Sequence, residues 1–228
     1  MRTALVVLMT AGALLGQETA LDRLKREAAR MKVDTASTAV HSALRDWIES
    51  RLPQTGGTAD EFRKLEAAMR GELKEAGLNI PDPLANALPD LGFGSVGFEL
   101  KWQPEALLAV ARVSVGCGTD DTIYAYRFDA GRWARVVEDH PKSKWGNTAS
   151  EPELSEPDSQ GRRLLLTHYV SVQCGSSWMR MAYSVYRLGL PAGAHETLLS
   201  GEQGFWLGNL DGPEFVLKPE EPSAISAP

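Results

Sequence analysis

The pattern of apolar and polar positions divides the chain into a helical part and a β-rich part. Between residues 18 and 77, apolar residues recur three or four positions apart among charged ones, which is the spacing of one helix face. After Gly94 the period changes to two, and residues 98–102 alternate apolar and charged side chains as a half-buried strand does. The sequence therefore predicts an α+β fold, with a helical segment before an antiparallel β-domain.

Three short amphipathic helices are predicted in the first part. Thr58 and Glu61 form a capping box at the start of the third helix, and Gly77 is placed to end that helix in the left-handed conformation. Helices of this kind must bury their stripes against each other or the rest of the chain, and an exposed first stripe would mark a docking surface. The three stripes are Leu21, Leu24, Ala28 and Met31; Val40, Leu44, Trp47, Ile48 and Leu52; and Phe62, Leu65 and Met69.

The β-rich part contains two segments of similar sequence, which we call the internal echo. Residues 107–119 read LLAVARVSVGCGT and residues 164–176 read LLLTHYVSVQCGS, with seven of 13 positions identical at a constant offset of 57. Residues 126–128 also resemble residues 186–188, at an offset of 60. This echo predicts a duplicated β-unit in a sandwich or strongly bent sheet, although two units do not establish a propeller or solenoid. The expected strands are 98–102, 106–115, 122–128, 132–138, 163–173, 178–188, 195–199 and 213–217, with a long polar loop at 139–161.

The beginning of the chain is typical of a cleavable signal peptide. Arg2 precedes 12 mostly apolar residues, a stretch too short to span a membrane, and the small residue Gly16 follows. We expect cleavage after Gly16, with Ala13 as the alternative, and a periplasmic or secreted product without stable membrane insertion. The expected segments are a signal peptide (1–16), a helical segment (17–78), a connector (79–92), an antiparallel β-domain (93–218) and a flexible tail (219–228).

The two cysteines occupy matched positions in the echo. In the alternating register, Cys117 and Cys174 share the more apolar face of each unit, so both side chains are expected to point inward. An exported chain with two cysteines permits one disulfide, and a bond between them would stabilise the fold by closing a long loop. Two buried free thiols and a reactive thiol are the alternatives, although neither cysteine has a Cys-x-x-Cys spacing.

No cofactor or metal motif is present in the sequence. Residues 92–97 match G-x-G-x-x-G, but a strand rather than a helix is expected to follow, so a dinucleotide site is not predicted. The four histidines form no H-x-H or H-E-x-x-H spacing. We expect His41 to flank its helix stripe and His168 to point into the core.

Four residues are candidates for binding. Asp120 and Asp121 could offer oxygen ligands to calcium, although an acidic hairpin turn is the simpler interpretation of residues 119–122. Trp145 and Trp178 lie near expected loops or turns, where an aromatic ring could stack on a carbohydrate or contact a peptide. The other aromatic residues of the β-part are expected to fill its core.

Charge and motifs together favour a binding protein. With 24 Lys and Arg against 30 Asp and Glu, the chain lacks the basic character that nucleic-acid binding requires. The sequence predicts an exported, non-catalytic binding or structural protein, with a protein or carbohydrate as the possible ligand. No catalytic residue, metal ligand or cofactor is assigned. The alternative is an exported hydrolase that pairs His168 or His195 with Asp120, Asp121 or Glu196.

Overall fold

The computed structural model describes residues 18–31, 37–79, 93–104, 106–115, 118–141, 146–172, 178–189, 195–206 and 218–219. The expected signal peptide, most of the connector, most of the flexible tail, Trp145 and both cysteines lie outside these residues, as does the strand expected at 213–217. The helices are α1 (Ala20–Arg30), α2 (Thr38–Arg51) and α3 (Ala59–Glu75). The strands are β1 (Val96–Gln103), β2 (Ala106–Val115), β3 (Gly118–Asp129), β4 (Arg132–Asp139), β5 (Thr148–Ala149), β6 (Glu153–Leu154), β7 (Arg163–Val172), β8 (Trp178–Leu188), β9 (Glu196–Trp206) and β10 (Lys218–Pro219).

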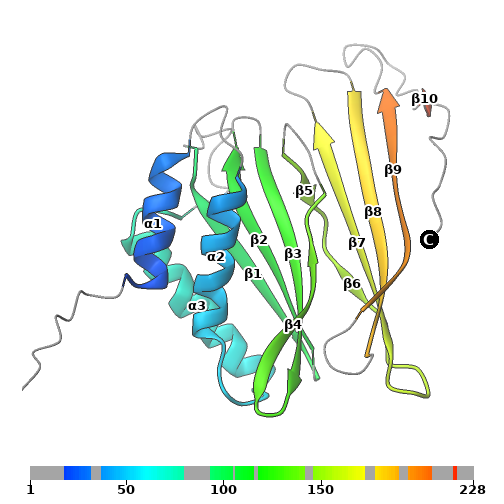
Figure 1. Ribbon diagram of the computed structural model, residues 1–228, viewed down its shortest axis with the longest axis horizontal. Coiled ribbons are helices and arrows are strands. Elements are labelled where there is room, and N and C mark those ends of the chain that lie inside the picture. Colours follow the sequence, from blue (N-terminus) through cyan, green and yellow to red (C-terminus); the bar gives the residue numbers. More distant parts are fainter. Residues whose placement is uncertain are drawn as a thin grey trace, which may run out of the picture.

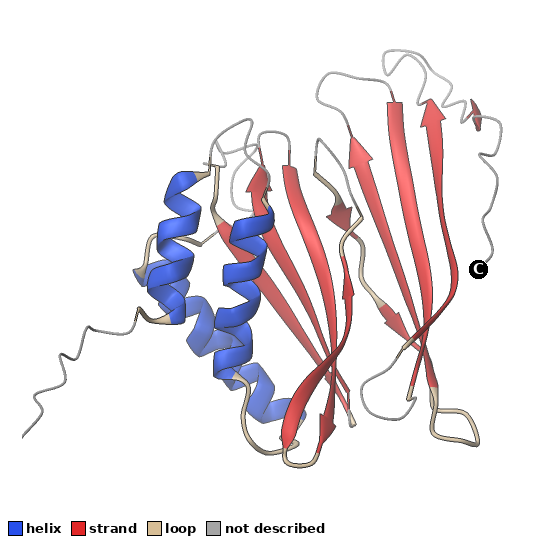
Figure 2. Cartoon of the chain, in the orientation of Figure 1, coloured by secondary structure: helices blue, strands red, loops and turns tan. Residues whose placement is uncertain are grey.

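These elements form three layers. The first sheet has the order β1-β2-β3-β4, and the second has the order β10-β9-β8-β7-β5, with β6 also paired to β7. All of these pairings are antiparallel. The three helices lie on one face of the first sheet and the second sheet lies on its other side (Figures 1 and 2). The predicted α+β class is therefore confirmed, and its β-part is a sandwich.

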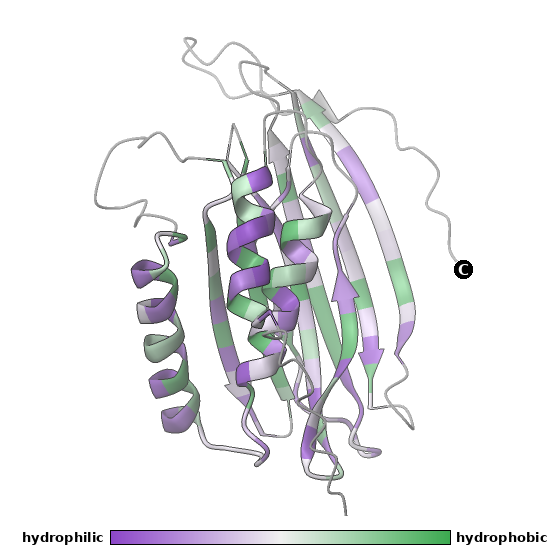
Figure 3. Cartoon of the chain, turned by 60° about the vertical axis from the view of Figure 1, so that its left-hand side comes forward, coloured by the Kyte–Doolittle hydropathy of each residue, from purple (hydrophilic) through white to green (hydrophobic). Residues whose placement is uncertain are grey.

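The helix layer follows the stripes expected from the sequence. Thr58 accepts a hydrogen bond from the backbone N–H of Glu61 at 3.3 Å, and Gly77 has a φ of 70° just beyond the end of α3. The stripe of α1 is turned inward, with Leu24 and Ala28 buried in the core that the helices share with the first sheet, so it is not an exposed docking stripe. Figure 3 shows hydrophilic and hydrophobic residues on each helix, as amphipathic packing requires.

The first sheet is buried on both faces. Along β2, Leu107, Ala109, Ala111 and Val113 belong to the core under the helices. The alternate residues Leu108 and Val110 lie on the opposite face, in clusters shared with the second sheet. This double burial explains why β2 is a nearly continuous apolar run.

The face of the second sheet that packs on the first sheet is the opposite of the one that the sequence suggested. Leu165, Thr167 and Tyr169 of β7 are buried between the sheets. The alternate residues, including Leu164 and His168, therefore lie on the outer face, and Leu164 is 43% exposed. The prediction that this face points inward was wrong for Leu164, Leu166, His168 and Val170, because the more apolar face of this strand is not the face that packs on the first sheet. Val172 was part of the same prediction, and its side chain lies outside the described ones.

Three local predictions also need correction. Residues 119–122 are not a hairpin turn but belong to β3, which begins at Gly118. The segment predicted as a polar loop at 139–161 contains the two short strands β5 and β6, which pair with β7. β9 is also longer than expected, because it extends from Glu196 to Trp206.

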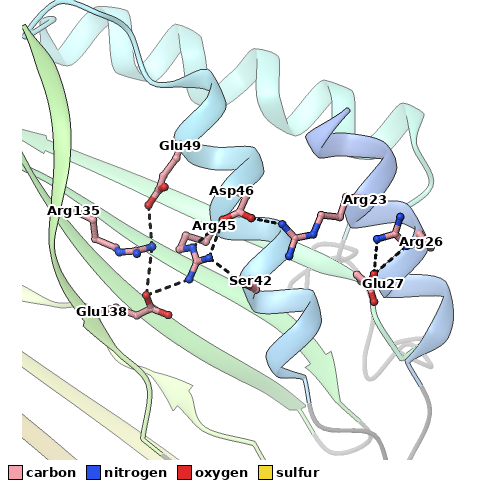
Figure 4. A network of polar contacts seen from close by, with 9 residues as sticks. All are labelled: Arg23, Arg26, Glu27, Ser42, Arg45, Asp46, Glu49, Arg135 and Glu138. Carbon is pink, nitrogen blue, oxygen red and sulfur yellow. Dashed lines mark hydrogen bonds and ion pairs between the residues drawn. The ribbon is translucent and has the colours of Figure 1, made fainter. Parts of the chain in front are cut away.

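Ion pairs connect the helix layer to the edge of the first sheet. Arg135 on β4 contacts Glu49 of α2 at 3.0 Å and Glu138 at 3.3 Å, and Arg45 of α2 contacts Glu138 at 3.4 Å. Arg45 also pairs with Asp46, which in turn pairs with Arg23 of α1 (Figure 4). These charges follow the seam between α2 and β4 and extend across α2 to α1.

Candidate functional site

Two histidines and an aspartate from three separate elements meet at one end of this seam. His41 lies in the first turns of α2, Asp120 lies in β3 on the face that meets the helices, and His140 follows β4 directly. Asp120 Oδ2 lies 3.1 Å from His140 Nε2 and 3.4 Å from His41 Nε2. One nitrogen or oxygen of each side chain lies within 4.8 Å of the others. We call these three residues the His–Asp cluster.

The alternation of β3 selects which carboxylate joins this cluster. Tyr124 and Tyr126 pack in the core beneath the helices, so Asp120 and Thr122, which have the same parity, point to that side. Asp121 points to the other side, where its Oδ2 accepts a hydrogen bond from the backbone N–H of Ala149 at 2.9 Å. Asp120 and Asp121 therefore cannot chelate one calcium ion together.

Two hydroxyl groups hold the cluster in place. Ser37 occupies the N-cap position of α2, where serine commonly caps the helix, yet its hydroxyl donates to Asp120 Oδ2 instead. Thr122 Oγ1 lies 3.1 Å from His41 Nδ1. If the Nδ1–H donates to Thr122, the lone pair of Nε2 is left facing Asp120 and His140.

The cluster is buried except at His140. His41 and Asp120 are almost fully buried, whereas the His140 side chain is 27% exposed. Among the described atoms, His41 Nε2 and Asp120 Oδ1 are buried without a hydrogen-bond partner. Such atoms are costly to leave unsatisfied, so their placement calls for an explanation.

The surroundings shift the ionisation of all three groups. Burial lowers the pKa of His41, although its contact with Asp120 acts in the opposite direction. Burial also acts to lower the pKa of His140, but the hydrogen bond to Asp120 outweighs it and the pKa is raised. Burial acts to raise the pKa of Asp120, yet its close contacts with His140, His41 and Ser37 hold that pKa below its usual range. The cluster therefore combines an ionised carboxylate with a His41 that favours its neutral form.

Asp121 is in a different environment. Burial raises its pKa to about 6, against the opposing effects of the Ala149 backbone N–H and of Arg112. Arg112 Nε lies 3.6 Å from Asp121 Oδ2 and the two residues are direct cross-strand partners. Asp121 thus secures the contact between β3 and β5.

The arrangement is not that of a serine nucleophile. In a Ser-His-Asp triad the serine hydroxyl is hydrogen-bonded to the imidazole that removes its proton. Here the Ser37 hydroxyl donates to the carboxylate of Asp120. What the three converging side chains offer is two imidazole nitrogens and a carboxylate oxygen, a set of ligands for a metal ion.

The sequence-based candidates are not gathered at this site. Of the four binding candidates, only Asp120 belongs to the cluster. Trp178 begins β8, but its side chain is outside the described residues, and Trp145 is not described. His168 lies on the outer face of the second sheet, and His195 is an exposed residue whose ring contacts Tyr186. The described structure does not bring either histidine to Asp120 or Asp121.

His41 and His140 were missed as partners because 99 positions separate them in the sequence. A weak signal was present, since His41, Leu44 and Ile48 are spaced three and four residues apart and therefore share a helix face. His41 is indeed buried, in line with Leu44 and Ile48. No comparable pattern marks His140, whose position depends on how β4 pairs with β3.

Comparisons with family models, with curated proteins and with solved structures found no match to this chain. None of the helices in the described part of the chain combines the length and the apolar character needed to cross a membrane.

Proposed function

We propose that this chain is an exported, non-catalytic binding protein that holds a divalent transition-metal ion of the zinc class between His41, Asp120 and His140. The observation that supports this proposal is the convergence of three ligand atoms from α2, β3 and the end of β4 within 4.8 Å. These elements are distant in sequence, so a bound ion would join the helix layer to the first sheet.

The separations of the ligand atoms suit a small tetrahedral ion. With metal–ligand bonds of about 2.0–2.1 Å, two ligands of a tetrahedral zinc site lie roughly 3.3 Å apart. The distances from Asp120 Oδ2 to the two histidine nitrogens are 3.1 and 3.4 Å. The two histidine nitrogens lie within 4.8 Å of each other, and the partly exposed His140 offers a path of entry for the ion.

The ligand types favour zinc over calcium or magnesium. Calcium and magnesium prefer sets of oxygen ligands, whereas imidazole nitrogens suit zinc, copper, nickel and iron. The hydroxyl of Thr122 beside His41 Nδ1 is the outer contact that commonly fixes the ring orientation of a metal-bound histidine. The lowered pKa of His41 also favours the neutral imidazole that metal ions bind.

Export is part of the same proposal. It is supported by the apolar run that follows Arg2 and by the small residue at the expected cleavage site. Intact mass spectrometry of protein from an exporting host should give a chain that begins at Gln17, with Cys117 and Cys174 alkylated only after reduction. A full-length mass with two free thiols would contradict both expectations.

Zinc titration of the mature protein tests the metal site directly. Isothermal calorimetry should show one zinc ion per chain, and cobalt should give the visible absorption of a tetrahedral nitrogen and oxygen site. His140→Asn should weaken zinc binding by about tenfold or more, since one of three ligands is lost. His168→Asn is the matched control, because His168 lies on the far side of the second sheet, and it should bind as the wild type does.

Two results would reject the proposal. One is the absence of zinc binding by a folded wild-type protein. The other is a His140→Asn variant that binds zinc as tightly as the wild type while circular dichroism shows the same fold. Asp120→Asn provides a second variant, because it keeps the shape of the side chain while removing the charge that a metal ion would need.

A hydrolase remains the second candidate, for one specific reason. Catalytic zinc sites commonly have three protein ligands and a fourth position that holds water, and the His–Asp cluster supplies three. Zinc-dependent hydrolysis of model esters or peptides, abolished by His140→Asn, would favour the hydrolase. Tight zinc binding without such turnover would favour the binding protein.

A further inference from the structure

The two sheets contain the same three-stranded unit. β2 and β7 cover equivalent positions at the offset of 57, from residue 106 to 115 and from residue 163 to 172. In each unit the next strand pairs with its successor through a register shift. These shifts lie between Ala125 and Tyr126 in the first unit and between Val185 and Tyr186 in the second, an offset of 60. The structural match therefore extends the sequence echo across three strands, β2-β3-β4 and β7-β8-β9.

The units face each other through equivalent surfaces. Leu108 of β2 and its counterpart Leu165 of β7 are buried in the same cluster between the sheets. The other face of each unit points away from the sandwich. In the first unit that face is the one with Leu107, which the helices cover. In the second unit it is the one with Leu164, which is exposed.

The exposed face of the second unit carries a group of apolar side chains, beside His168, Gln203 and the ion pair between Arg187 and Glu196. Leu164 and Leu199 are the two large apolar side chains with more than a third of their surface exposed in the described part of the chain, and both lie on this face. Tyr183 lies across Gly201 of the neighbouring strand, where an added Cβ would come within 2.6 Å of its hydroxyl oxygen. The half-buried apolar residues beside them, placed on this face by the strand registers, are Leu166, Val170, Met179, Met181, Val185 and Phe205.

The three helices in the described part of the chain are not available to cover that face. Leu24, Leu44 and Met69 place all three helices in the core over the first sheet. The second unit is preceded by residues 140–162, a segment that contains only the short strands β5 and β6 among its described residues. The unit thus has the surface on which helices pack in its counterpart, without a helical segment before it.

The size of the face indicates what kind of partner fits. Three strands spaced about 4.8 Å apart give a width of roughly 14 Å, and ten residues at about 3.3 Å give a length of roughly 33 Å. The resulting footprint, roughly 460 Å², is well below the 800 Å² or so that each partner buries in a stable protein dimer. The width fits one helix, whose diameter with side chains is about 10–12 Å.

We propose that the outer face of β7, β8 and β9 binds an amphipathic helix of a partner protein. The apolar positions of that helix, spaced three and four residues apart, would pack on Leu166, Val185 and Leu199, which lie in one row across the three strands. This is the packing that α2 makes on β2 in the first unit. It is independent of the metal site, which lies on the other side of the first sheet.

A labelled peptide of residues 37–52 can serve as the probe. It contains α2, which packs on β2, the strand equivalent to β7. Fluorescence anisotropy with the mature protein should show saturable binding at micromolar concentration, and a scrambled peptide of the same composition should not bind. Leu199→Asp should weaken binding by about tenfold or more, as the loss of a central anchor does. Leu164→Asp is a second variant, and both positions are exposed enough for the fold to persist.

Lys64→Asp is the matched control, since it changes the charge of an exposed position on α3 and should leave the affinity unchanged. Three outcomes would overturn the proposal. They are the absence of peptide binding, binding that Leu199→Asp does not weaken, and sedimentation showing that the wild type is a dimer which Leu199→Asp dissociates. The last outcome would identify a second copy of the chain as the occupant.

Discussion

The first and second sheets are built from similar strands but stand in different surroundings. The first sheet is enclosed between the helices and the second sheet, so both faces of β2 are buried. The second sheet has one buried face and one open face, although the open face carries leucine, valine and methionine side chains. The comparison teaches that the sequence of a β-unit does not decide which of its faces is covered. It depends on what the rest of the chain places over each unit, and the three described helices all pack on the first.

The largest difference between the sheets should appear when equivalent leucines are shortened. Leu107→Ala removes a side chain that is fully buried beneath the helices and should lower the free energy of unfolding by about 2–5 kcal/mol. Leu164→Ala removes the equivalent side chain from the open face and should cost less than about 1 kcal/mol. Urea denaturation of the two variants measures both values. Similar losses would mean that the two faces are equally covered.

A smaller loss of stability is expected when alanine replaces a glycine that lies close to other atoms, because the new Cβ would collide with them. In Gly94→Ala the new Cβ would lie 2.5 Å from the backbone oxygen of Ala28, so α1 would have to move. Gly131→Ala has a similar positive φ with no atom within 4 Å, and it should cost only the backbone strain of about 1–2 kcal/mol. Gly94→Ala should cost about 1–3 kcal/mol beyond that control.

The open face should tolerate the same change better. Gly201→Ala meets the flexible Tyr183 side chain, which can swing into solvent, so we expect a loss below about 1 kcal/mol. Thermal unfolding of the three variants ranks these effects. A Gly201→Ala loss as large as that of Gly94→Ala would show that Tyr183 is held in place by a covering layer.

The smallest effect should come from the ion pairs at the edge of the first sheet. Glu138→Gln removes the carboxylate that Arg45 and Arg135 share, and partly exposed pairs of this kind contribute about 1 kcal/mol or less. Glu196→Gln removes a single partner of Arg187 in the second sheet and should have a smaller effect still. Chemical denaturation at low and high salt checks both, because screening should erase the difference.

The sequence predicted the bounds of the helices and strands better than it predicted which of their faces are buried. Apolar spacing identified all three helices, and the capping residues Thr58 and Gly77 gave the limits of α3. Apolar runs bounded by turn residues also located β2 and β8 at their observed bounds. These features depend on local geometry, which a sequence carries directly.

The orientation of β7 could not be predicted in the same way. Its outer face carries Leu164, Leu166 and Val170, whereas its inner face includes Thr167 and Ser171, whose burial would ordinarily argue against that choice. The inner face is stabilised by polar contacts between the sheets: Thr167 donates to Asp139 Oδ2, and Tyr169 donates to the backbone oxygen of Asp139 at 2.6 Å. Such partners become visible only when the two sheets are placed together.

The His–Asp cluster was hidden for a similar reason. Its residues come from a helix, a strand and a strand end, and no spacing in the sequence connects them. Asp120 was identified as a candidate binding residue, but its grouping with Asp121 was wrong because adjacent residues of a strand point to opposite faces. Sites assembled from distant elements in this manner require the fold before they can be recognised.

Methionine oxidation tests most directly whether the outer face of the second sheet is open. Met69 of α3 is buried in the core that the helices share with the first sheet, whereas the half-buried Met179 and Met181 are placed on the outer face by their register with β7. Brief treatment of the folded protein with hydrogen peroxide, followed by peptide mass spectrometry, should oxidise Met179 and Met181 while Met69 stays protected until the protein unfolds. Protection of Met181 equal to that of Met69 would show that the outer face is already covered, and it would contradict the account of the two sheets given above.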